Sequence, residues 1–93
     1  MSEQKILHLN VKGEYFDQIK SGEKVQEFRL YNDYWRKRLE TEDYDLVLIK
    51  KGYPKRDDWD RIEARPYRGY QIKEITHPHF GNDPVEVFAI WVN

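Results

Sequence analysis

The segment Gly22-Glu23-Lys24-Val25-Gln26-Glu27-Phe28-Arg29 places a lysine, a glutamate and an arginine close together behind a glycine turn. Charged side chains are rarely buried unless they are paired, because desolvating an unpaired charge costs several kcal/mol or more. Side chains alternate along a strand, so Glu27 and Arg29 share one face. Lys24 joins them only if the preceding turn or a bulge rotates it. The segment therefore predicts a strand whose charges either form an ion pair, with Lys24 in solvent, or line a cleft.

The spacing of Gly22, Lys24, Glu27 and Arg29 gives the pattern Gly-x-Lys-x-x-Glu-x-Arg. At every defined position this pattern resembles the signature of the ASCH domain superfamily, whose members are small relatives of the PUA fold. The resemblance covers most of the chain. It implies a single ASCH-like domain over residues 1–93, with an α+β fold in which a small PUA-like β-barrel carries two short helices.

The same resemblance implies a cleft that handles RNA or modified nucleosides. Some small bacterial ASCH proteins hydrolyse the acyl amide of N(4)-acetylcytidine, and a ribonuclease activity is known in another branch. In those acetylcytidine hydrolases a threonine stands at the position of Glu27. A covalent threonine route is therefore not expected here, and the resemblance implies that the catalytic residues are Lys24, Glu27 and Arg29.

Amide hydrolysis needs a nucleophile, stabilisation of the tetrahedral oxyanion and a proton for the leaving amine. Glu27 would deprotonate the attacking water, and Lys24 would stabilise the oxyanion or protonate the leaving nitrogen. Arg29 would orient Glu27 or hold a substrate oxygen through its planar fork. In the alternative, desolvation makes Lys24 the base.

Composition limits the class of protein. The chain has 93 residues, of which 35% are charged, with a formal net charge of −1. This balance argues against a general polyanion binder, because non-specific nucleic-acid affinity comes mainly from a basic surface. The absence of cysteine excludes disulfides and thiolate zinc sites and is compatible with a reducing cytoplasm. No signal-peptide core or long apolar run is present, so a cytoplasmic protein that does not enter the membrane is expected.

The rest of the chain predicts mixed α and β elements without repeats. Strands are expected over residues 6–11, 44–50, 69–76 and 85–92, a helix over residues 14–21, and loops over residues 51–66 and 77–84. Gly22 is expected to end the first helix, and Asn32 or Asp33 to cap a second one. This second helix is predicted to turn Tyr34, Trp35 and Leu39 inward. The last strand is apolar on both faces and should be buried on both sides.

A pyrimidine base needs flat walls and contacts along its edge. Tyr31 is the first candidate because it shares the face of Glu27 and Arg29, while Asn10 or Gln26 could read the ring edge. The other predicted substrate-binding residues are aromatic or imidazole side chains: Trp35, Tyr53, His77, His79 and Phe80.

His77 and His79 also raise the question of a metal. Metal sites need three or four ligands, which without cysteine would have to come from Asp83, Glu86 or His8. A pair that braces its loop or faces the substrate is favoured instead, so neither a metal nor a cofactor is expected.

The resemblance thus implies a metal-independent hydrolase of a non-peptide amide, whose partner is a modified cytidine nucleoside or RNA carrying one. Two other classes remain open. A non-catalytic RNA-binding ASCH module would tolerate loss of Glu27. An ASCH-type ribonuclease would have to activate a ribose hydroxyl and protonate the leaving oxygen, for which His77, His79 and Lys24 are available.

Overall fold

A computed structural model describes residues 4–93 of the chain. The described elements, in chain order, are β1 (Ile6–Val11), α1 (Gly13–Ser21), β2 (Gln26–Leu30), α2 (Asp33–Leu39), β3 (Leu46–Lys51), the 3-10 turn η1 (Trp59–Arg61), β4 (Ile62–Pro66), β5 (Tyr70–Ile75), the 3-10 turn η2 (Pro78–Phe80) and β6 (Val85–Trp91). Within residues 4–93, no helix is both long and apolar enough to span a membrane.

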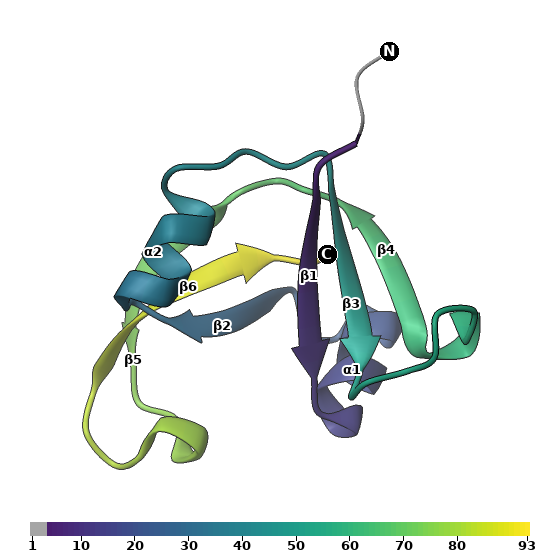
Figure 1. The fold of residues 1–93 in the computed structure, drawn as a ribbon. Helices are drawn as coiled ribbons and strands as arrows, with labels where there is room; N and C mark the ends of the chain where they lie inside the picture. Colours follow the sequence, from purple (N-terminus) through teal and green to yellow (C-terminus); the bar gives the residue numbers. More distant parts are fainter. Residues whose placement is uncertain (1–3) are drawn as a thin grey trace.

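The strands form two three-stranded sheets, with the orders β1-β3-β4 and β2-β6-β5 (Figure 1). β1 and β3 run parallel, while the other neighbours are antiparallel. The expectation of an α+β fold with two short helices is confirmed, but a closed barrel is not. Among the described residues, β1 and β2 share no backbone ladder, and it is the Arg29 side chain that links them by donating from Nη2 to the Asn10 carbonyl at 2.8 Å.

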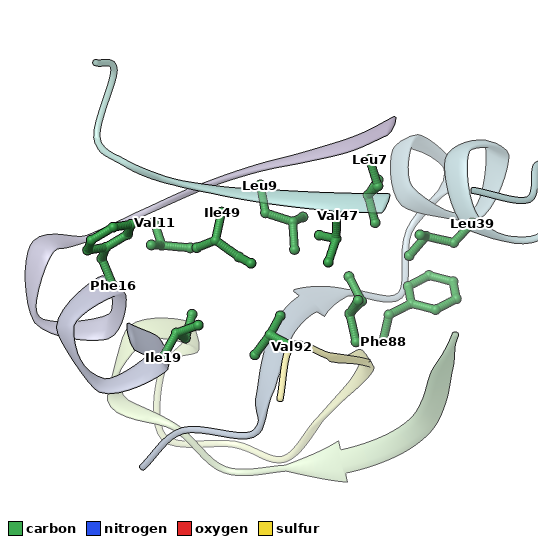
Figure 2. Close-up of a cluster of buried hydrophobic side chains, with 11 residues drawn as sticks. Leu7, Leu9, Val11, Phe16, Ile19, Leu39, Val47, Ile49, Phe88 and Val92 are labelled. Atoms are coloured by element: carbon green, nitrogen blue, oxygen red, sulfur yellow. The ribbon is translucent and has the colours of Figure 1, made fainter. Parts of the chain in front are cut away.

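The core lies between the two sheets. The alternation expected in β1 is confirmed, with Leu7, Leu9 and Val11 buried. β6 is the central strand of its sheet, and Val87 to Ile90 are all fully buried, as its apolar faces predict. Figure 2 shows side chains from both sheets and both helices meeting in this core.

The predicted ends of the helices are also confirmed. Gly22 follows α1 with φ 88°, a left-handed conformation that carries no Cβ penalty, and its N–H donates to the Ile19 carbonyl. Asn32, rather than Asp33, caps α2. Tyr34 was expected to point inward, and this is wrong: it is 55% exposed, with the Arg38 guanidinium over its ring.

The prediction of one polar loop over residues 51–66 is wrong at its C-terminal end. Ile62–Pro66 forms β4, an edge strand that pairs with β3, placing Glu63 opposite Ile49. A short edge strand has few apolar residues of its own. The register of β4 is set by its pairing with β3, so the sequence of residues 62–66 alone did not indicate a strand.

Asn32→Ala should lower the free energy of unfolding by about 1 kcal/mol, because the Asn32 side chain accepts the Trp35 N–H at 3.0 Å and caps α2. Urea unfolding measures this difference. Asn82→Ala, at an exposed loop position, is the matched control and should change stability by less than about 0.5 kcal/mol. Equal stability of the two variants would show that the cap contributes nothing.

Candidate active site

A cavity of about 310 Å³ lies where β1 leads into α1 and meets β2, α2 and the loop before β6. This volume is at the lower end of the range of small-molecule sites, roughly 300–1,000 Å³. Its lining residues are Asn10, Val11, Lys12, Tyr15, Lys24, Glu27, Phe28, Arg29, Leu30, Asn32, Trp35, His77, His79 and Phe80.

Glu27 and Arg29 form an ion pair in the wall of this cavity. Glu27 Oε1 lies 3.2 Å from Arg29 Nη1, and their side chains are only 7% and 18% exposed. The guanidinium also donates to the carbonyls of Phe28 at 2.9 Å and Asn10 at 2.8 Å. Three contacts therefore fix Arg29, and through it they fix one oxygen of the Glu27 carboxylate.

This ion pair also protects the open edge of β2. In the register of β2 and β6, the Phe28 peptide groups face away from β6. Glu27 Oε1 accepts the Phe28 N–H at 3.1 Å, and Arg29 covers the Phe28 carbonyl. Capping an exposed strand edge is a sufficient structural reason for Arg29 and for Glu27 Oε1.

The second oxygen of Glu27 is not explained by edge protection. Glu27 is 5% exposed, and its Oε2 is buried without a hydrogen-bond partner among residues 4–93. Leaving a buried carboxylate oxygen unsatisfied is costly, and native structures contain few such atoms. Glu27 lines the cavity, so the carboxylate that carries this unsatisfied oxygen is part of the cavity wall.

Lys24 reaches the cavity from the segment before β2, where strand alternation does not restrict it. Its Nζ lies 5.3 Å from the centre of the Tyr15 ring and 4.7 Å from that of Phe28. Aromatic faces attract cations. Within residues 4–93, no carboxylate lies within 4.0 Å of this ammonium group. The Lys24 ammonium group is thus positioned by the aromatic rings of Tyr15 and Phe28 and not by a carboxylate.

The loop before β6 supplies His77, His79 and Phe80 to the cavity. His77 packs edge-on against Tyr15, and its Nδ1 accepts the His79 N–H at 3.1 Å. Because Nδ1 is an acceptor, neutral His77 carries its proton on Nε2. His77 therefore braces its own loop, in which η2 ends at Phe80 and Gly81 follows as the C-cap.

Most of the predicted site residues come together here. Lys24, Glu27 and Arg29 line one cavity, and so do Trp35, His77, His79 and Phe80. Asn10, a candidate for reading the ring edge, lines it as well. Gln26 does not: its side chain bonds to Gln71 and Lys73 on β5.

Two predicted substrate-binding residues lie outside the cavity lining. Tyr31 does not reach the cavity, although Glu27 and Arg29 on the same face do: its ring packs against the core, 5.0 Å from that of Phe88, and its hydroxyl donates to Glu40. Tyr53 is 93% exposed in the loop after β3. Tyr67 is also outside the cavity lining: it packs edge-on against Tyr44, and burial raises the pKa of Tyr67 to about 12.

Sequence reasoning missed six lining residues: Val11, Lys12, Tyr15, Phe28, Leu30 and Asn32. Asn32 was expected only as a helix cap, and it also keeps that role. No local signal indicated that the same residue would line a cavity. For Lys12 the available signal was its position between the strand that ends at Asn10-Val11 and the helix that follows.

Among residues 4–93, no group of three or more His, Cys, Asp or Glu side chains could hold a metal ion. Comparisons with family models, curated proteins and solved structures gave no match to this chain. Membership of the ASCH superfamily thus stays a prediction from the motif residues Gly22, Lys24, Glu27 and Arg29.

Proposed function

We propose that this protein is an ASCH-like, PUA-related hydrolase of a non-peptide amide. It removes the acyl group from N(4)-acetylcytidine or a related N(4)-acylated cytosine nucleoside, in the cytoplasm and without a metal. The observation that carries the proposal is the buried carboxylate of Glu27, whose Oε2 has no partner among residues 4–93, in a cavity shared with the Lys24 ammonium. The resemblance at the motif supplies the substrate class.

In this proposal Glu27 takes a proton from a water molecule, whose oxygen attacks the acyl carbonyl carbon. The tetrahedral intermediate then loses its bond between carbon and N4, and the exocyclic nitrogen receives a proton. The products are a carboxylate and an unmodified cytosine amine. Glu27 suits the part of the base because one of its oxygens is held by Arg29 and the other is unpartnered within residues 4–93.

In this proposal Lys24 stabilises the negative charge that develops on the acyl oxygen. With aromatic rings and no carboxylate around its ammonium within residues 4–93, it is ready to stabilise an oxyanion or protonate the leaving nitrogen. Arg29 is a positioning residue, since its contacts with Glu27, Phe28 and Asn10 leave it little freedom to follow a substrate. Trp35, 5.5 Å from the Arg29 guanidinium, and Phe80 offer walls for a flat base.

A ribonuclease is the second candidate, and one observation favours it. His77 and His79 line the same cavity as Lys24, so two imidazoles and an amine are available for acid-base chemistry on a ribose hydroxyl. In that reaction Glu27 would be dispensable for proton transfer. A non-catalytic RNA-binding module is the outcome if neither reaction occurs.

The deciding experiment incubates the purified protein with N(4)-acetylcytidine and, in parallel, with a short single-stranded RNA. We expect release of cytidine, no chain cleavage, and the same rate in the presence of a chelator. Cleaved RNA with intact N(4)-acetylcytidine would replace the proposal by the ribonuclease. Binding without either reaction would leave the RNA-binding module, and a rate lost to chelator and restored by zinc would contradict metal independence.

A further inference from the structure

The cavity carries an excess of positive charge. Glu27 and Arg29 offset each other, while Lys12 and Lys24 also line the cavity, and no carboxylate of residues 4–93 lies within 4.0 Å of either amine. His77 and His79 add two groups that become cationic on protonation. The chain as a whole has a net charge of −1, so this excess is local. Cavities lined by one sign of charge concentrate ligands of the opposite sign.

The first turn of α1 adds hydrogen-bond donors beside the part of the cavity that Lys12 and Tyr15 line. α1 has nine residues, and its N-cap residue Lys12 provides no side-chain cap. Within the described chain, the N–H groups of Gly13, Glu14 and Tyr15 have no acceptor. Free N–H groups at a helix start favour an anion. Two nearby acids do not cancel this: Glu14 is exposed, and Asp17 is paired with Lys51.

A separate observation places an unsatisfied acceptor in the wall of the cavity. Glu27, at 5% exposed, lines it with an Oε2 that has no partner among residues 4–93. This oxygen requires a donor, whereas Lys12 and the helix start require an acceptor. A single ligand that satisfies both must carry a hydrogen-bond donor at one place and a negative charge at another.

We propose that the substrate carries a phosphate on its ribose, and that Lys12 and the first-turn N–H groups of α1 bind this phosphate while the acylated base lies toward Glu27. This inference rests on the proposed function for the identity of the base. The phosphate can be the monoester of a free nucleotide or a phosphodiester of RNA, since both present the same anionic oxygens. A neutral nucleoside would leave the positive end of the cavity unused.

The test measures binding, so it does not depend on turnover. Isothermal titration compares cytidine, cytidine 5′-monophosphate and a short oligocytidine with internal phosphodiesters. We expect one of the phosphorylated ligands to bind about 10- to 100-fold more tightly than cytidine, as for one or two charge-assisted hydrogen bonds. Lys12→Ala should remove this difference, and Lys20→Ala, an exposed lysine at the other end of α1, should keep it.

The outcomes separate this inference from the proposed function. Tighter binding of the monophosphate indicates a free nucleotide, and tighter binding of the oligonucleotide indicates RNA. Equal affinity for cytidine and both phosphorylated ligands, or no binding of the phosphorylated ligands, overturns the inference. A preference that survives Lys12→Ala overturns the assignment to this end of the cavity. Hydrolysis of neutral N(4)-acetylcytidine by the same preparation would, in either case, leave the proposed function standing.

Discussion

Glu27→Gln should lower the turnover of N(4)-acetylcytidine by about two to four orders of magnitude while substrate still binds. Glutamine keeps the shape of the side chain and can still accept the Phe28 N–H, which Glu27 Oε1 accepts at 3.1 Å. It cannot take a proton from water. The expected loss is therefore in kcat, with a smaller change in KM.

The measurement compares turnover per folded molecule and melting temperature on the same purified variant. If Glu27 only protects the edge of β2, Glu27→Gln lowers the melting temperature and leaves turnover near normal. Glu23→Gln, the same chemical change at an exposed position four residues earlier, is the matched control and should alter neither quantity. Retained activity in Glu27→Gln would reject Glu27 as the base and transfer that role to Lys24.

Arg29→Met should lower the free energy of unfolding by about 3–5 kcal/mol, the usual cost of removing one partner of a buried ion pair. The substitution leaves the Glu27 carboxylate, only 7% exposed, without its cation. It also removes the donors to the Phe28 and Asn10 carbonyls, and with them the side-chain link between β2 and β1. Urea unfolding of the two proteins gives the difference directly.

A double-mutant cycle identifies the cause of that loss. Adding Glu27→Gln to Arg29→Met removes the buried charge, so the double variant should be more stable than Arg29→Met alone. Arg29→Lys should recover only part of the stability, because an ammonium group lacks the planar fork that reaches Phe28, Asn10 and Glu27 together. A double variant less stable than Arg29→Met would contradict the buried-charge explanation.

These two expectations address different halves of one ion pair. Arg29 is fully engaged by its contacts with Phe28, Asn10 and Glu27, so we expect its substitution to affect mainly stability. Glu27 has one oxygen engaged and one without a partner among residues 4–93, so we expect its substitution to affect mainly turnover. Opposite results for the two residues would indicate that Glu27 is structural and that Arg29 contacts the substrate.

Local sequence patterns predicted most of the secondary structure. Alternation in residues 6–11 and the two apolar faces of residues 85–92 identified β1 and β6, because burial on one or both faces selects those patterns directly. Gly22 and Asn32 marked helix ends through backbone and side-chain chemistry that acts within a few residues. The strand β4 was not predicted, because it forms only by pairing with β3 and a local pattern describes one segment at a time.

The sequence by itself also selected three charged residues that line one cavity in the fold. The motif spacing singled out Lys24, Glu27 and Arg29, and alternation put Glu27 and Arg29 on one face, where they form an ion pair. Alternation failed for Tyr31, which shares that face but covers Phe88, because a strand face does not state whether a given position meets a cavity or the core.

The cavity itself was decided only by the tertiary structure. It needs Tyr15 from α1, Phe28 from β2 and His77 from the loop before β6, which no local pattern brings together. The position of Lys24 over two rings, and the lack of a partner for Glu27 Oε2 among residues 4–93, also depend on contacts between distant segments. Propensity, alternation and capping act over a few residues, whereas the surroundings of a charge are set by packing across the whole fold.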